Sequence, residues 1–115
     1  MSLSEARSTV QVETDGRVLA EADVRPGREP GVVVSAMHVE SGHLPRGVRA
    51  RLVDAVLALP LVGSAERLVA SVPIGDAEML DRMRERSDEV RTHYAGATTI
   101  VEAQLVPRPR WGAAR

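Results

Sequence analysis

Hydrophobic and polar residues alternate in the first third of the chain, which predicts strands. From Val10 the apolar residues take every second position, and Asp15-Gly16 is a two-residue hairpin signal because a type I′ turn needs positive φ. A return strand over 17–24 follows, then a loop rich in Pro and Gly, then a third strand over 32–39. The third strand opens with three consecutive Val, a run typical of a central strand buried on both faces.

The period then changes from two to that of a helix. Val48, Leu52 and Leu59 recur at helical spacing, and Pro60 is expected to end this first helix. A fourth strand over 66–72 returns to alternation.

A second helix is predicted to begin at Asp76, whose carboxylate suits an N-cap. Met79, Met83 and Val90 lie along its apolar stripe, and Gly96 is expected to close it. The charged positions of this helix are expected to form a solvated face. A last strand over 98–106 completes the chain.

The predicted order is therefore β-β-β-α-β-α-β. This order indicates an α+β fold: a mixed, mostly antiparallel sheet with helices packed on it. We expect a single domain over 9–106, preceded by a flexible N-terminus (1–8) and followed by a Pro- and Arg-rich tail (107–115).

Composition narrows the classes of function. A formal charge of −1 gives no reason to expect a nucleic-acid partner, and the lack of Cys excludes disulfides and thiolate chemistry. No apolar run approaches a membrane span or a signal-peptide core, so we expect a cytoplasmic protein. Arg replaces Lys throughout, a bias that we associate with a bacterial source.

The core is predicted to be built from small side chains. Aromatic residues make up 2% of the 115 residues, so burial is thin for a chain of this size. Association is a common remedy, and we expect a homodimer that pairs through the edge of the first hairpin or of the last strand.

The stretch 39–57 reads VESGHLPRGVRARLVDAVL. Together with the order of elements, it resembles the GNAT superfamily of acyl-CoA-dependent N-acyltransferases over about residues 10–106. The family's pyrophosphate loop has Gln or Arg, two residues, Gly, one residue, then Gly or Ala. The corresponding positions here hold Leu44, Gly47 and Arg49, so only the middle glycine is kept.

The resemblance implies acetyl-CoA or another acyl-CoA as cofactor. A helix N-terminus after a strand suits a pyrophosphate because its N–H groups are unpaired. Arg49 departs from the pattern, since its side chain could fill the phosphate position; alternatively it pairs with phosphate beside Arg46. The implied cofactor-binding residues are Val39, Arg46, Gly47, Val48, Arg49 and Asp76.

The residue that acts as general acid in the family is not kept in this chain. Where the family has a Tyr that protonates the departing thiolate, this chain has Met83, and a thioether has no proton to give. The one Tyr, Tyr94, lies further on and is expected to be a core or rim residue. The strand and two helices that precede the hairpin in the family, which form much of the acceptor wall, have no counterpart before Val10.

Two further hypotheses concern residues at the end of the third strand. Glu40 could serve there as a general base. His38, Glu40 and His43 could instead supply three metal ligands, although we expect no metal.

Three hypotheses remain. The first is a non-catalytic or weakly active GNAT-like domain that acts as a small binding or assembly module, with residual CoA affinity or none. The second is an active acyl-CoA-dependent N-acyltransferase. The third is a small metal-dependent enzyme at His38, Glu40 and His43.

Overall fold

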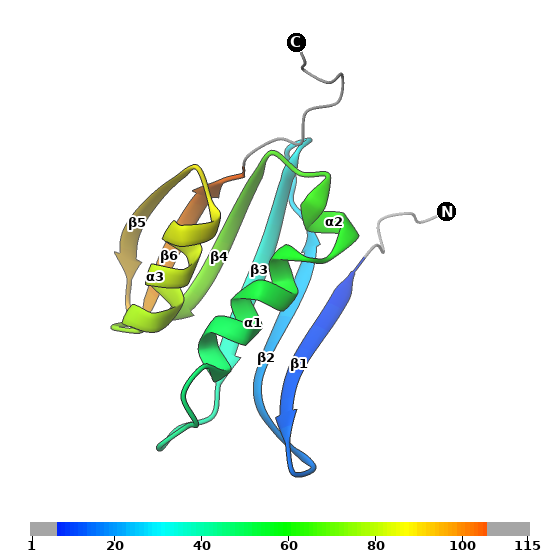
Figure 1. The fold of residues 1–115 in the computed structure, drawn as a ribbon. Helices are drawn as coiled ribbons and strands as arrows, with labels where there is room; N and C mark the ends of the chain where they lie inside the picture. Colours follow the sequence, from blue (N-terminus) through cyan, green and yellow to red (C-terminus); the bar gives the residue numbers. More distant parts are fainter. Residues whose placement is uncertain (1–6, 106–115) are drawn as a thin grey trace.

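Residues 7–105 are described by a computed structural model, and they form six strands and three helices (Figure 1). In chain order these are β1 (Ser8–Thr14), β2 (Arg17–Pro26), β3 (Val32–Val39), α1 (Val48–Leu57), α2 (Pro60–Gly63), β4 (Arg67–Pro73), α3 (Ala77–Arg86), β5 (Glu89–Ala95) and β6 (Thr98–Gln104).

All six strands belong to one sheet, in the order β1-β2-β3-β4-β6-β5. β3 and β4 pair in parallel, and every other neighbouring pair is antiparallel. Since β4 and β5 both run antiparallel to β6, they are parallel to each other, with β6 inserted between them. The α+β fold and the mixed, mostly antiparallel sheet are therefore confirmed.

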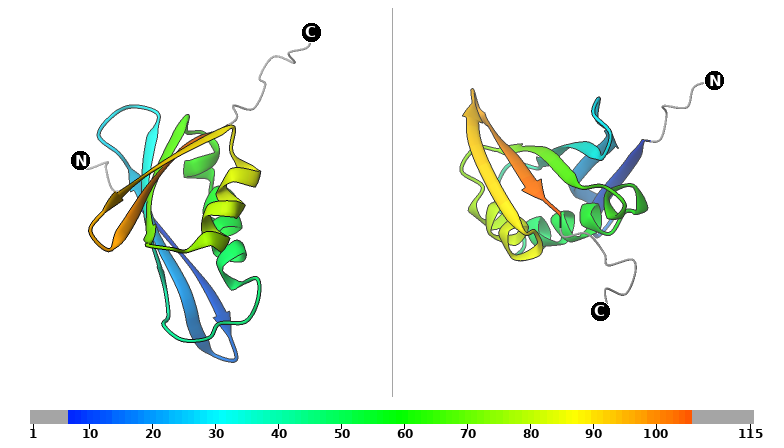
Figure 2. Two further views of the ribbon diagram at one scale, coloured as in Figure 1. Left: turned by 90° about the vertical axis from the view of Figure 1, so that its left-hand side faces the viewer. Right: turned by 90° about the horizontal axis from the view of Figure 1, so that it is seen from above.

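The two long helices α1 and α3 cover the same face of the sheet (Figure 2). The crossovers β3-α1-β4 and β4-α3-β5 advance in the same direction across the sheet, so a common hand places both helices on one side. Among residues 7–105 no helix covers the opposite face.

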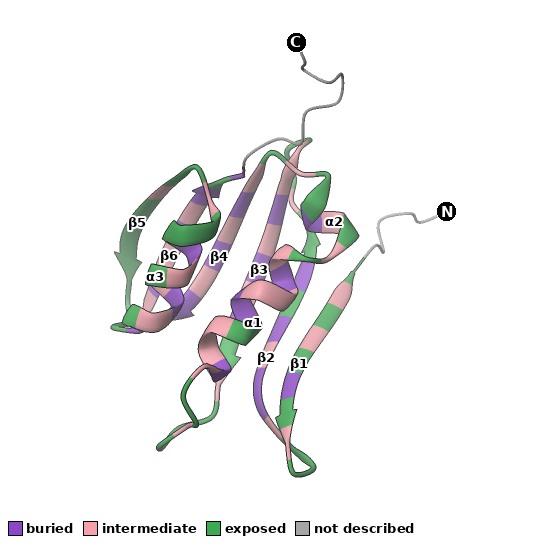
Figure 3. Ribbon diagram, in the orientation of Figure 1, coloured by how far each residue is buried: buried purple, intermediate pink, exposed green. Residues whose placement is uncertain are grey.

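The core lies between these helices and the sheet, where the buried positions form stripes along the central strands (Figure 3). The predicted inward positions of the fourth and last strands are buried: Leu68, Ala70, Val72, Val101 and Ala103 are all 1% exposed or less. From α1 the buried residues are Val48, Leu52, Val53 and Val56.

The second long helix is shorter than predicted. α3 ends at Arg86, Ser87 is extended with φ −124° and ψ 158°, and the chain continues as β5. Val90 therefore lies on a strand, and Gly96, with φ 65°, lies in the β5–β6 hairpin instead of closing a helix. The prediction was wrong because Val90 happens to continue the helical stripe of Met83.

Two smaller expectations also differ from the structure in part. α1 ends before Pro60, as predicted, but the short helix α2 was not predicted, and Pro60 stands at its start, where the missing N–H costs nothing. The last strand is not an edge, because β6 lies between β4 and β5; the edges are β1 and β5. Val106, the predicted end of that strand, and the tail lie outside the described residues.

Candidate functional site

The carboxyl ends of β3 and β4 diverge. The parallel ladder runs from Val32 opposite Arg67 to Ala36 opposite Ser71, and it stops there. Beyond this point Met37–Val39 pair only with β2, and Val72–Pro73 pair only with β6. Open sheets bind ligands where neighbouring strands part in this way, so we take this end of the sheet as the candidate site.

α1 begins beside this opening. Gly47 is its N-cap residue and has φ 90°, a left-handed conformation that other residues adopt only at a cost. A glycine has no side chain with which to cap the helix, so the first N–H groups of α1 must find acceptors elsewhere.

Arg49 turns toward the start of α3. Its Nε donates to Asp76 Oδ2 at 2.9 Å, and the Asp76 side chain is only 5% exposed. Oδ1 of the same carboxylate accepts from the Met79 N–H at 3.1 Å, which confirms Asp76 as the N-cap of α3. Arg49 and Asp76 were both predicted as cofactor-binding residues, and the structure pairs them with each other.

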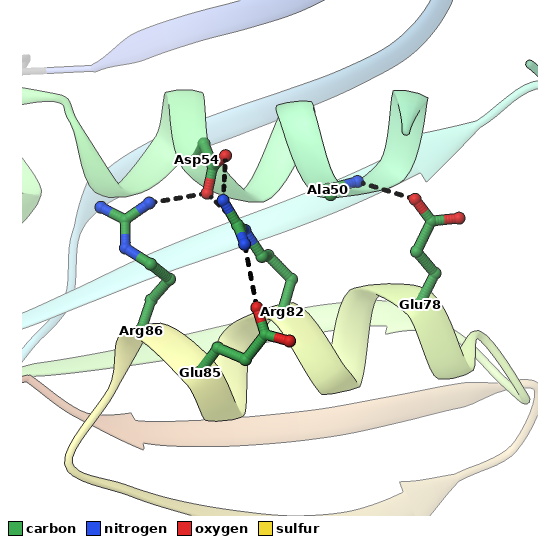
Figure 4. A network of polar contacts seen from close by, with 6 residues as sticks. All are labelled: Ala50, Asp54, Glu78, Arg82, Glu85 and Arg86. Carbon is green, nitrogen blue, oxygen red and sulfur yellow. Dashed lines mark hydrogen bonds and ion pairs between the residues drawn. The ribbon is translucent and has the colours of Figure 1, made fainter. Parts of the chain in front are cut away.

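Glu78, in the first turn of α3, reaches across to α1 (Figure 4). Its Oε2 accepts a hydrogen bond from the Ala50 N–H at 3.2 Å. Ala50 lies in the first turn of α1, where helix N–H groups have no partner within the helix. The carboxylate thus supplies the acceptor that Gly47 cannot, and it also complements the positive end of the α1 dipole.

The seam between the two helices continues as a charged network (Figure 4). Arg82 of α3 donates to both oxygens of Asp54 on α1, and Arg86 donates to Asp54 Oδ1 at 2.6 Å. The hydrogen bond from Arg82 lowers the pKa of Asp54, and Arg86 adds to the effect while burial opposes it. The same pairing raises the pKa of the Arg82 guanidinium.

Sequence reasoning missed the role of this helix face. The charged residues of α3 were expected to face solvent, whereas Glu78, Arg82 and Arg86 bind groups of α1. Their charge and helical spacing match those of an ordinary solvated face, so the pattern alone gave no signal that a second helix lay alongside.

Glu40, the candidate base, lies just past the end of β3. Its carboxylate pairs with Arg17 at the start of β2, and the side chain is 41% exposed. His38 and His43 are exposed as well. Within residues 7–105 no group of three or more His, Asp or Glu side chains could hold a metal ion, so these three residues do not form a centre there.

Neither Met83, at the position of the family's Tyr, nor Tyr94 supplies an acid beside Glu40. Met83 lies on the face of α3 that packs on the core and is completely buried. Tyr94 is 73% exposed on the edge strand β5, so the expectation of a core position was wrong and that of a rim position fits. β4 and β6 separate β5 from β3, which puts the two strands roughly 14 Å apart at the usual spacing.

Comparison with solved structures identifies the fold. A putative acetyltransferase, yncA, from Salmonella typhimurium with its cofactor acetyl-CoA matches with a TM-score of 0.65 and 14% identity, over 90% of this chain and 66% of that one. Diaminobutyrate acetyltransferase EctA from Paenibacillus lautus, in complex with substrate and coenzyme A, matches with a TM-score of 0.66 and 11% identity, over 89% and 73%. The GNAT domain of S. lividans PAT matches with a TM-score of 0.61 and 17% identity, over 86% and 61%.

These matches show that the chain has the GNAT superfamily fold. At such low identity the likeness establishes the fold alone. The chain spans about two thirds of the length of the structures that it matches. No protein-family model matches the chain, and no curated protein matches it significantly.

The residues at the start of α1 do not fit a coenzyme diphosphate as they stand. The Ala50 N–H is bound to Glu78, and the Arg49 guanidinium is bound to Asp76. Two carboxylates of α3 therefore already occupy two donors of the first turn of α1. Of the predicted cofactor-binding residues, Arg46 is exposed, Val48 is buried, and Val39 ends β3 beside the opening.

No helix within residues 7–105 has the length and apolar character needed to cross a membrane.

Proposed function

We propose that this chain is a GNAT-fold module that does not transfer acyl groups and that acts through binding or assembly. The observation that carries the proposal is the pairing of Glu40 with Arg17 in solvent. Amine acylation needs a base that can take a proton from the acceptor amine. A carboxylate held by a guanidinium at an exposed strand end is poorly suited to that task.

The lack of a suitably placed general acid supports the same proposal. Proton transfer to a departing thiolate needs a donor within hydrogen-bond reach. Met83 has no exchangeable proton and lies in the core, and Tyr94 lies on the far edge of the sheet. Neither can work as a pair with Glu40 in this arrangement.

Assembly is proposed as a homodimer that pairs through β1. This strand is an edge, it is seven residues long, and Glu13 is its one charged residue. β5, the other edge, carries Glu89 and Arg91, and charges on an edge oppose pairing with another strand. Two β1 strands related by a two-fold axis would extend the sheet across the dimer.

A second candidate is an active acyl-CoA-dependent N-acyltransferase, favoured by one observation. The divergence of β3 and β4 after Ala36 and Ser71 keeps the open strand ends that a ligand could enter. A water molecule would then have to carry protons between Glu40 and the reacting groups.

A turnover assay separates the two candidates. Purified protein is incubated with acetyl-CoA and a panel of primary amines and amino acids, and free thiol is measured. We expect release no faster than in buffer. Amine-dependent thiol release that Glu40→Gln abolishes would overturn the non-catalytic proposal, and Glu13→Gln is the matched control because it removes an exposed carboxylate on the far side of the hairpin.

A further inference from the structure

Two polar contacts join α1 and α3 where the two helices begin. One is the ion pair of Arg49 with Asp76, and the other is the hydrogen bond from the Ala50 N–H to Glu78. Both acceptors come from the beginning of α3, and both donors come from the first turn of α1. The two helix starts are therefore joined directly by these two contacts.

From this arrangement we infer that α3 supplies an internal substitute for the diphosphate of coenzyme A. The carboxylates of Asp76 and Glu78 bind the groups of α1 that would otherwise bind phosphate oxygens. The site is thus occupied by the chain itself, and the wild-type protein does not bind the coenzyme there.

Because Asp76 is buried, a ligand would not easily replace it as the partner of Arg49. The Asp76 side chain is 5% exposed and is held on both oxygens, by Met79 N–H and by Arg49. Taking Arg49 away to bind phosphate would leave a buried carboxylate with one hydrogen bond fewer, which is costly.

Charge around the seam also opposes a diphosphate. An open hollow of about 440 Å³ lies beside the Ala50–Glu78 contact. Besides Ala50, its lining holds three carboxylates and a single guanidinium, those of Glu78, Asp81, Glu85 and Arg82. The guanidinium of Arg82 is already engaged by Asp54 and Glu85. A phosphate approaching here meets a net negative surface.

This inference concerns binding of the coenzyme, whereas the proposed function concerns transfer, so binding without turnover would overturn the inference alone. A protein that binds coenzyme A could still lack turnover. Conversely, turnover with Glu78 in place would require a bound coenzyme and would contradict both.

The test uses backbone amide NMR of the full chain, with coenzyme A and inorganic diphosphate as separate probes. The variants are Glu78→Ala, Glu78→Gln and the double variant Asp76→Asn with Glu78→Ala, because a Gln amide oxygen could still accept from the Ala50 N–H. Glu85→Ala is the matched control, because Glu85 lies on the same helix and on the same hollow, but its carboxylate accepts from Arg82 of α3 and not from the Ala50 N–H. Dispersed amide spectra establish that each variant is folded.

The first readout is hydrogen exchange of the Ala50 amide. We expect exchange at least tenfold faster in Glu78→Ala and unchanged exchange in Glu85→Ala. Equal exchange in wild type and Glu78→Ala would mean that the carboxylate does not bind this N–H, which would overturn the inference.

The second readout is the shift of the Arg49 and Ala50 amides during titration. We expect no shift in wild type at millimolar coenzyme A or diphosphate, and saturable shifts in the double variant, with affinity at least tenfold higher. Saturable shifts in wild type would overturn the inference. A double variant that stays silent would also overturn it, because something other than the two carboxylates would then exclude the anion.

Discussion

Asp54 of α1 accepts a two-pronged hydrogen bond from Arg82 of α3, with both N–O distances at 2.8 Å. The two helices belong to successive crossovers, and this pair fixes them to each other at the surface of the core. Arg86 adds a second guanidinium on Asp54. The carboxylate is therefore the centre of the contact, and its loss should affect both helices.

Asp54→Asn is expected to reduce the free energy of unfolding by about 1 kcal/mol at pH 7, since both side chains are 34% exposed and water screens the pair. The pKa of Asp54 is lowered from its ordinary value of 3.8 in the folded state. Its contribution is therefore complete above that value and is lost as the pH falls through the lower folded pKa.

Urea unfolding of wild type and Asp54→Asn from pH 7 to pH 2 measures this dependence. The difference between the two proteins should stay constant above the ordinary pKa of 3.8 and shrink as the pH falls below it. Asp81→Asn is the control, because the Asp81 side chain is 71% exposed and pairs with Arg84 only at 3.9 Å. A difference that grows on acidification would contradict the assignment.

Gly47 and Gly63 form a natural pair for testing backbone strain. Neither has any atom within 4 Å of an added Cβ, but only Gly47 has positive φ. We expect Gly47→Ala to cost about 1 kcal/mol, because the left-handed conformation disfavours a Cβ. Gly63→Ala should be neutral or stabilising by about 0.5 kcal/mol, because it restricts the unfolded chain. Thermal or urea unfolding of both variants measures the change in the free energy of unfolding and its sign. Equal changes in the two variants would argue against the left-handed conformation of Gly47.

Met83 provides the next prediction. Its side chain is completely buried, so Met83→Ala should cost about 2–5 kcal/mol through the cavity that it leaves. Met83→Leu should cost under about 1.5 kcal/mol. Met83→Tyr, which restores the residue type of the family, should destabilise by about 1–3 kcal/mol and produce no thiol release, because the larger ring overpacks the core. A stable Tyr variant with turnover would mean that this position faces the site.

The sequence predicted most of the sheet because its signals are local. The Asp15-Gly16 turn, the alternation around Leu68 and the helical spacing of Leu52 all depend on neighbours along the chain. β5 was missed although Val90, Thr92 and Tyr94 alternate, because Val90 also continues the stripe of α3. Only pairing with β6, which is a tertiary contact, decides between the two periods.

The candidate site was predictable in outline but not in its contacts. Gly47 and the N-cap Asp76 follow from local rules for helix starts, and both were found. The bond from Ala50 to Glu78 joins residues 28 positions apart on different helices. No periodicity links them, and a Glu one residue inside a helix is ordinary. The partner of Arg49 could be named only once the two helix starts were placed side by side.

The last prediction tests the β1 edge. Thr9 and Gln11 are exposed and hydrogen-bond across the hairpin to Asp23 and Glu21 respectively. Lysine at either position would meet a carboxylate within its own chain, so the hairpin should keep its stability. Two β1 strands from different copies would, however, bring these new charges together, and like charges on an edge oppose pairing.

Light scattering and sedimentation of wild type, Thr9→Lys and Gln11→Lys measure the effect. We expect a dimer for wild type at micromolar concentration and a dissociation constant at least tenfold higher for the two variants. Thr92→Lys places the same charge on β5, the other edge, and should leave association unchanged. If Thr92→Lys alone dissociates the dimer, the copies pair through β5. If wild type stays monomeric as its concentration rises, neither edge is used, and the proposed assembly is wrong.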